Sequence, residues 1–344
     1  MKVDKLTFMA PLGKGDIIKG YHVTSKEIIR YMVECGLDLR VHNLDHIIIP
    51  EFKALQEKDE KDRFILLREI PTVWPKADGF YTVTEFNQPT YGSISPIYKS
   101  KLTITESEFC KKVYEKYSDN EVAIIQSPID KSFTPEGPKY NFEGSLNDFS
   151  FKFLAVFEWI MRKDPYSLIA AFCSEFDPKE DVCLIIRCWS VFENPRKWIG
   201  MLAKNHNVFW LEKRVEDMSA LYRSCDCQVS STLGEGFGRT YVESMACGML
   251  NILPNATAIS EYANPSNAIM IETKEDIVGN RVNELAHLIK PYFKIQVPDR
   301  EELKKAMRYV YENNCDDLKN EALKIRERFN IENTKNQIRE AFEL

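Results

Sequence analysis

The stretch GEGFGRTYVESMACG, residues 234–248, sets two acidic residues among glycines at the start of a predicted helix. Gly236 and Gly238 let the backbone approach a ligand closely, and the N–H groups of the first helical turn are good partners for a diphosphate. Glu235 and Glu243 repel phosphate, but their carboxylates accept hydrogen bonds and therefore suit the hydroxyl groups of sugars. A nucleotide sugar fits both features, because its diphosphate lies between two hydroxyl-rich rings.

A simpler interpretation applies to Glu243. The run Thr240-Tyr-Val-Glu243 matches a capping box, in which the glutamate would only bond backbone N–H groups at the helix start. These four residues alone leave the capping role open. The surrounding glycines and basic residues favour a ligand-binding role.

Two basic residues, Arg162 and Lys163, follow the apolar run FKFLAVFEW, residues 151–159, which predicts a buried strand. They are therefore expected at the carboxyl end of that strand. Arginine offers a planar fork and lysine a point charge, and both suit a leaving diphosphate. The alternative is a solvated pair on a loop with no ligand.

Short apolar runs alternate with amphipathic segments twice along the chain, which predicts an α/β fold with two mostly parallel, doubly wound sheets. Strands are expected at residues 6–12, 39–44, 79–85, 101–106, 122–128, 151–159, 182–189, 207–212, 227–231, 250–254 and 268–272. Helices are expected at residues 24–36, 107–118, 165–176, 194–205, 215–225 and 239–248, and the chain after Arg300 is nearly all helix former. Ser107 is expected to cap its helix.

A stretch rich in Pro, Gly, Asn and Ser, residues 130–147, interrupts this pattern and predicts a linker. We therefore expect an acceptor-side Rossmann-like domain at residues 1–145 and a Rossmann-like domain for the nucleotide sugar at residues 146–328. A C-terminal helix at about 329–344 could pack back on the first domain. Two such domains would face each other across a crevice at the carboxyl ends of their strands, where doubly wound folds bind ligands.

The run EGFGRTYVESMACG resembles the E-x7-E signature of retaining, two-domain GT-B glycosyltransferases of group 1, also called family 4. The resemblance implies that Glu235 holds hydroxyl groups of the donor sugar and that Glu243 holds the ribose. Ser244 stands where the family usually has alanine, and Thr240 where proline is common. The likeness covers about residues 13–272 and is strong from residue 151 onward.

The donor side of the resemblance extends beyond the two glutamates. The segment FKFLAVFEWIMRKDPYSLIAAF is similar to a strand, loop and helix on which the family binds the donor phosphates, and this implies the same role for Arg162 and Lys163. Many members carry an arginine soon after this strand, where this chain has Glu158. Further donor-binding residues implied by the resemblance are Gly236, Phe237, Gly238 and Arg239 for the diphosphate, and Lys213, Arg214, Val215 and Leu221 for the base. Helix packing explains Leu221 equally well.

The first half resembles the family less closely. Its segment APLGKGDIIKGYHV is similar to the family's opening strand, glycine-rich loop and helix, but it is neither a G-x-G-x-x-G fingerprint nor a P-loop. The acceptor-side candidates are Gly13, Lys14, Gly15, His22 and Glu85. For His22 the alternative is an ordinary first-turn helix residue, and for Glu85 it is a structural role.

The activity implied by the resemblance is transfer of a hexose from a UDP- or GDP-sugar to a sugar, glycan or other hydroxyl acceptor. The anomeric configuration would be retained, and neither a metal nor another cofactor would be needed. The donor base stays open. The alternatives are another GT-B enzyme, such as a nucleotide-sugar epimerase, and a catalytically silent protein that binds sugar nucleotides.

Composition narrows the class of protein. The chain has 344 residues and a formal net charge of -6, which gives no general attraction for nucleic acid. Its first apolar run is too short for a secretory signal, and no apolar stretch is long enough to span a membrane, so we expect a cytoplasmic protein. Peripheral contact with a membrane stays open.

The nine cysteines form no spaced framework, and they lie mainly in apolar segments, which favours reduced, buried thiols. Cys225 and Cys227 are expected to point into a core. His42 and His46 lie in a predicted strand and turn, where a spacing of four does not converge on a metal. No metal site is expected.

Overall fold

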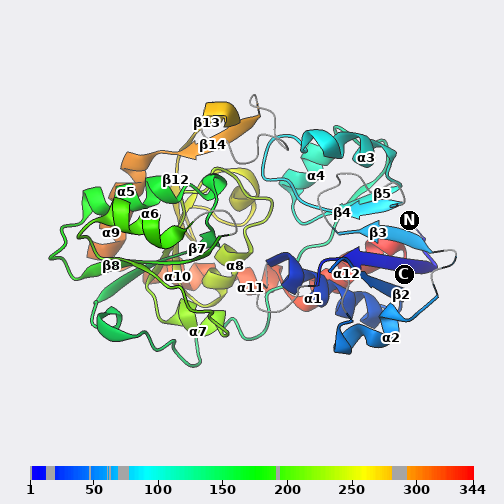
Figure 1. The fold of residues 1–344 in the computed structure, drawn as a ribbon, viewed down its shortest axis with the longest axis horizontal. Coiled ribbons are helices and arrows are strands. Elements are labelled where there is room, and N and C mark those ends of the chain that lie inside the picture. The colour runs from blue at the N-terminus through cyan, green and yellow to red at the C-terminus, as the bar shows by residue number, and fades with distance from the viewer. Residues whose placement is uncertain are drawn as a thin grey trace. The chain divides into compact units, whose positions relative to one another are not determined.

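The computed structural model describes residues 2–12, 20–45, 48–59, 61, 63–68, 77–190, 194–280 and 293–344. The chain divides into two compact units (Figure 1). Unit 1 consists of Met1–Pro128 and Phe329–Leu344, and unit 2 of Ile129–Arg328. The candidate acceptor-side residues 13–15 lie outside the described residues.

Unit 1 contains a six-stranded parallel sheet. Its strands are β1 (Lys5–Ala10), β2 (Asp38–Asn43), β3 (Phe64–Leu67), β4 (Gly79–Tyr81), β5 (Leu102–Thr105) and β6 (Val122–Ile124), in the order β2-β1-β3-β4-β5-β6. Its helices are α1 (Gly20–Glu34), α2 (Lys53–Gln56), α3 (Ile94–Lys99), α4 (Glu108–Tyr114) and α12 (Ile331–Phe342). Ser107 caps α4 as predicted, because its side chain accepts from the Cys110 backbone N–H at 3.1 Å. Strand β3 was not predicted.

Both faces of this sheet are covered by helices. Helices α1 and α12 pack on one face, with a core that extends from Leu6 in β1 to Phe342 in α12, and α3 and α4 cover the other face (Figure 1). The C-terminal helix is also held by hydrogen bonds. The Gln126 backbone N–H donates to the Gln337 side chain at 2.8 Å, and the Thr334 hydroxyl donates to the Gln126 carbonyl at 2.9 Å. Helix α12 is therefore an integral layer of unit 1.

Unit 2 contains a second six-stranded parallel sheet. Its strands are β7 (Phe151–Glu158), β8 (Val182–Trp189), β9 (Val208–Trp210), β10 (Cys227–Val229), β11 (Leu250–Pro254) and β12 (Ile269–Ile271), in the order β12-β11-β10-β7-β8-β9. Read from β9, this is the order 3-2-1-4-5-6 of a doubly wound sheet. The direction of winding reverses between β7 and β10, so the carboxyl ends of these two strands form the switch point where such sheets bind ligands.

The helices of unit 2 are α5 (Pro165–Glu175), α6 (Pro195–Ala203), α7 (Met218–Arg223), α8 (Arg239–Ala246), α9 (Arg300–Glu312), α10 (Asp316–Ala322) and α11 (Ile325–Arg328). Helices α5, α6 and α9 pack on one face of the sheet, whereas α7 and α8 lie on the other (Figure 1). An antiparallel hairpin of β13 (Thr273–Ile277) and β14 (Lys294–Pro298) follows the sheet and was not predicted. The Gln296 backbone N–H of β14 donates to the Leu233 carbonyl at 3.1 Å.

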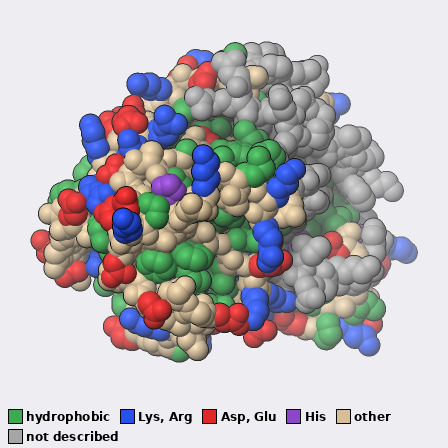
Figure 2. Space-filling model, turned by 60° about the vertical axis from the view of Figure 1, so that its left-hand side comes forward, with side chains coloured by type: hydrophobic (Ala, Val, Ile, Leu, Met, Phe, Trp, Pro, Cys, Tyr) green, Lys and Arg blue, Asp and Glu red, His purple; other side chains and the backbone are tan. Residues whose placement is uncertain are grey.

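Seven of the nine cysteine side chains are buried, including Cys225 and Cys227. Burial raises the pKa of the Cys110 and Cys188 thiols to about 12, so both stay protonated at neutral pH. Figure 2 shows acidic and basic side chains interspersed over the face that it presents. Each helix within the described ranges is too short or too polar to cross a bilayer.

Truncation of Phe342 tests whether α12 is part of the core. Its side chain is fully buried in unit 1, so Phe342→Ala should lower the free energy of unfolding by about 3–5 kcal/mol. Leu344→Ala is the matched control, because Leu344 is 51% exposed and its truncation should change stability by less than about 0.5 kcal/mol. Urea unfolding measures both variants, and equal effects would contradict the packing of α12 on the sheet.

Candidate functional site

The loops that follow β7 and β10 are bonded to each other at the switch point of unit 2. After β7 the chain forms a short 3-10 turn, Met161–Lys163, and after β10 it forms the glycine-rich loop, residues 230–238. The Leu233 backbone N–H donates to the Arg162 carbonyl at 2.8 Å, and the Ser231 hydroxyl donates to the Asp164 carbonyl at 2.8 Å. These bonds give the basic turn and the glycine-rich loop a fixed geometry.

Glu235 lies at the centre of this arrangement. Its Oε1 pairs with the Lys163 ammonium, and its Oε2 lies 3.4 Å from Nη1 of Arg162. The same Nη1 donates to the Gly234 carbonyl at 2.7 Å, so Arg162 holds the loop as well as the carboxylate. The Glu235 backbone N–H donates to the Thr257 hydroxyl at 3.0 Å, which anchors the residue from the segment after β11.

Glu235 is only 5% exposed, yet its carboxylate remains acidic. Burial alone would raise its pKa, because it disfavours the charged form. Burial is the largest single effect, but the charges of Lys163 and Arg162 and the hydrogen bonds from Lys163 and Thr232 together outweigh it, so the pKa of Glu235 lies below its ordinary value of 4.5. The side chain is therefore an ionised hydrogen-bond acceptor at neutral pH.

Helix α8 begins one residue before Thr240. Its N-cap is Gly238, in a left-handed conformation with φ of 86°, and this residue offers no side chain to the helix. Thr240 lies within the first turn, so the capping box considered for Thr240 and Glu243 does not form. Glu243 instead accepts from Arg239 Nε at 2.5 Å and from the Tyr222 hydroxyl at 3.3 Å.

The start of α8 has the properties of an anion site. The N–H groups of a first helical turn and the positive end of the helix dipole favour negative charge. Arg162 and Lys163 pair with Glu235 on the loop that leads into this helix, and Arg239 lies at its first position. Arg239 is unfavourable next to the helix dipole on its own, and its ion pair with Glu243 offsets that cost.

The four base-pocket candidates follow β9 and separate into two kinds. Val215 and Leu221 are buried, and Leu221 lies within α7. The burial of Leu221 also agrees with its alternative role in helix packing. Lys213 and Arg214 are exposed. The Lys213 ammonium pairs with Glu143, and this hydrogen bond raises the pKa of Lys213.

Two of the acceptor-side candidates are described, and both lie in unit 1. His22 is buried in the first turn of α1, and Glu85 lies half-buried after β4. His42 is half-buried in β2, and His46 lies outside the described part of the chain.

Sequence patterns did not identify the two tyrosines that contact the glutamates. The Tyr241 hydroxyl lies 3.1 Å from Oε1 of Glu235, and the Tyr222 hydroxyl lies 3.3 Å from Oε2 of Glu243. Both tyrosines are buried. Tyr241 lies inside the signature run, and a left-handed turn at Gly238 lies between it and Glu235 along the chain.

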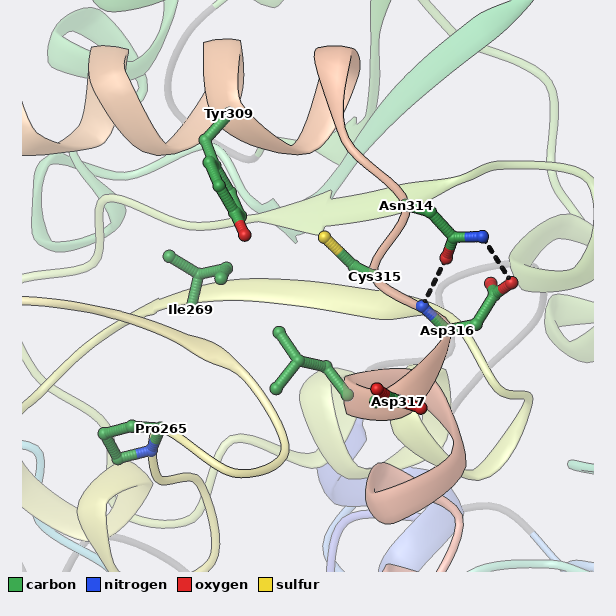
Figure 3. Close-up of a pocket in the computed structure, with 8 residues that line it drawn as sticks. Pro265, Ile269, Tyr309, Asn314, Cys315, Asp316 and Asp317 are labelled. Atoms are coloured by element: carbon green, nitrogen blue, oxygen red, sulfur yellow. Dashed lines mark hydrogen bonds between the residues drawn. The ribbon is translucent and has the colours of Figure 1, made fainter.

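A pocket of about 650 Å³ lies elsewhere in unit 2 (Figure 3). It is lined by Pro265, Ile269, Tyr309, Asn314, Cys315, Asp316, Asp317 and Leu318. These residues come from β12, α9, α10 and the adjoining loops, and none is a candidate site residue from the sequence.

Comparison with known protein families matches part of unit 2. Residues 152–290 match the family model described as glycosyl transferases group 1. Comparison with curated proteins gives no sequence match. The matched range contains Arg162, Lys163 and both glutamates.

Solved structures confirm the predicted GT-B fold. Sucrose-phosphate synthase from Thermosynechococcus elongatus has a TM-score of 0.70 at 12% identity, covering 99% of this chain and 98% of that one. WaaG, a glycosyltransferase involved in lipopolysaccharide biosynthesis, has a TM-score of 0.66 at 12% identity, covering 96% and 98%. HepE from Anabaena, in complex with UDP and glucose, has a TM-score of 0.64 at 14% identity, covering 98% and 99%.

Gly238 allows a direct test of the turn before α8. A Cβ atom there would lie 2.6 Å from the Tyr262 hydroxyl and 2.7 Å from a ring carbon of Tyr241, at a φ that disfavours side chains. Gly238→Ala should therefore lower the free energy of unfolding by at least about 2 kcal/mol. Gly200→Ala is the control, because Gly200 lies in α6 with open space around it and should gain up to about 1 kcal/mol. Urea unfolding measures both variants, and an equal change in the free energy of unfolding would refute this geometry.

The lowered pKa of Glu235 predicts a pH-dependent contribution to stability. The contribution is complete above the unfolded value near 4.5 and is lost as the pH falls from there through the folded pKa. Below about pH 4.5, wild type should therefore lose stability relative to Glu235→Gln, so that its unfolding free energy minus that of the variant becomes smaller. Urea unfolding from pH 7 to pH 3 measures it, and a difference that stays constant or grows on acidification would contradict the ion pair.

Proposed function

We propose that this protein is a retaining hexosyltransferase that moves a hexose from a nucleotide diphosphate sugar to an acceptor hydroxyl. One observation carries the proposal: a buried, ionised carboxylate, Glu235, is held by Lys163 and Arg162 beside the start of α8. The carboxylate suits sugar hydroxyls, whereas the cations and the helix start suit a diphosphate. A nucleotide sugar brings both groups in one molecule.

The reaction develops negative charge on the leaving diphosphate, and fixed donors aimed at that charge lower the barrier. Arg162 and Lys163 would supply cationic donors, and the backbone from Gly236 to Arg239 would supply N–H groups. The burial of these groups strengthens their electrostatic effect. The proposal needs no divalent cation for this step.

The two glutamates would bind the two rings of the donor. Glu235 would accept from hydroxyls of the sugar, and Glu243 from hydroxyls of the ribose. In their present contacts both carboxylates accept from a cation and from a tyrosine, so each is already oriented. Val215 and Leu221 would contact the base, while Lys213 and Arg214 lie at the exposed end of the same segment.

The donor base is proposed by analogy. The structure of HepE from Anabaena, which has the same fold, is in complex with UDP and glucose. UDP-glucose is therefore the first donor to test, and GDP-sugars are the second. The acceptor-side residues His22 and Glu85, with Gly13, Lys14 and Gly15, stay candidates for acceptor binding.

Turnover measured as nucleotide release, with a panel of sugar and glycan acceptors, tests the proposal. Lys163→Ala and Glu235→Ala should each lower kcat by about 10²–10³, because they remove a charge-stabilising donor and the sugar's acceptor group. Lys324→Ala is the control: it removes a lysine that is 66% exposed in a surface ion pair, and turnover should be unchanged.

The anomeric configuration of the product, read by NMR, tests retention. An inverted product would refute the retaining mechanism. Full turnover in both site variants would refute the assignment of the site.

A further inference from the structure

A buried chain of hydrogen bonds runs from the end of β10 to Glu235. The Thr232 backbone N–H donates to Ser230 Oγ at 3.2 Å, Ser230 Oγ lies 2.7 Å from the Tyr241 hydroxyl, and that hydroxyl lies 3.1 Å from Glu235 Oε1. All three side chains are buried. The chain links the second sheet directly to the candidate sugar-binding carboxylate.

The chemistry of the groups sets the direction of this chain. An ionised carboxylate only accepts, so the single hydrogen of the Tyr241 hydroxyl goes to Glu235. Ser230 must then donate to Tyr241, while its own oxygen accepts from Thr232. Burial, and then the charge of Glu235, raise the pKa of Tyr241 well above its ordinary value, so the phenol remains a donor.

The chain makes the two oxygens of Glu235 unequal. Oε1 accepts from both Lys163 and Tyr241, and two donors match the two lone pairs of a carboxylate oxygen. Oε2 has the longer contact with a cation, 3.4 Å to Arg162, which is at the weak end for an N–H donor. The Thr232 hydroxyl also bonds the carboxylate. Its closer partners are the Gly234 and Arg162 carbonyls, at 3.2 and 3.4 Å. Oε2 is therefore the oxygen with capacity for a strong new donor.

We propose that Tyr241 is a positioning residue for Glu235. With Lys163, its hydroxyl group saturates Oε1 of the carboxylate and so leaves Oε2 to accept from a hydroxyl of the donor sugar. This inference rests on the proposed function and deepens it. It adds a residue that touches no substrate but decides which carboxylate oxygen the sugar meets. Tyr222, which donates to the second glutamate, provides an internal comparison.

The test measures binding of UDP and of UDP-glucose separately by calorimetry, with GDP and GDP-mannose as a second pair. Tyr241→Phe should raise the ratio of the sugar nucleotide's Kd to the nucleotide's Kd by roughly fivefold to tenfold, because a charge-assisted hydrogen bond that orients the carboxylate is lost. The Kd of the nucleotide alone should change less than about twofold. Tyr222→Phe should instead weaken both members of the pair together.

Two further variants keep the test decisive. Ser244→Ala removes another buried hydroxyl from α8. This hydroxyl bonds Asn251 and the Tyr241 carbonyl but neither glutamate, so the ratio of the two Kd values should equal that of wild type. Ser230→Ala removes the donor to Tyr241, and should shift the ratio in the same direction as Tyr241→Phe. In the double variant Ser230→Ala should add little, because both substitutions break one chain.

An unchanged ratio in Tyr241→Phe, or in Ser230→Ala if the first variant does not fold, would overturn the positioning role alone. An equal loss of affinity for nucleotide and sugar nucleotide would overturn it as well, since the effect would then be structural. If wild type binds neither pair, the proposed donor class fails and this inference fails with it.

Discussion

The ion pair between Glu235 and Lys163, with Arg162 beside it, is the interaction on which the rest of the site depends. A carboxylate as buried as Glu235 is costly unless it is paired and hydrogen-bonded. Its partners come from the loop after β7, while Glu235 comes from the loop after β10. The pair therefore joins the two strand ends at which the winding of the sheet reverses.

The same residues explain why phosphate-binding and sugar-binding groups can coexist in one small region. The cations keep Glu235 ionised, and Glu235 in turn offsets the mutual repulsion of two cations held close together. Arg239 and Glu243 form a second ion pair between a cation and a glutamate, across the first turn of α8. A ligand that carries both a diphosphate and hydroxyl groups can engage each pair without leaving a buried charge uncompensated.

Much of the fold could be predicted from sequence because the strands of unit 2 are continuous apolar runs, such as VCLIIRCW and LNILP, which match β8 and β11. Strand β3 is short and flanked by charge, and the β13–β14 hairpin is polar, so neither has a strong apolar signal. The spacing of the signature placed Glu235 and Glu243, but not their contacts. The contact of Tyr241 with Glu235 spans a left-handed turn at Gly238, and a residue pattern does not encode which ring lies near the carboxylate.

A crystal structure of the protein with UDP-glucose tests the central claim most directly. The account predicts the diphosphate at the start of α8, within reach of Arg162 and Lys163, and a sugar hydroxyl within hydrogen-bond distance of Glu235 Oε2. A ligand bound with its sugar away from Glu235, or in the pocket beside Tyr309, would contradict it.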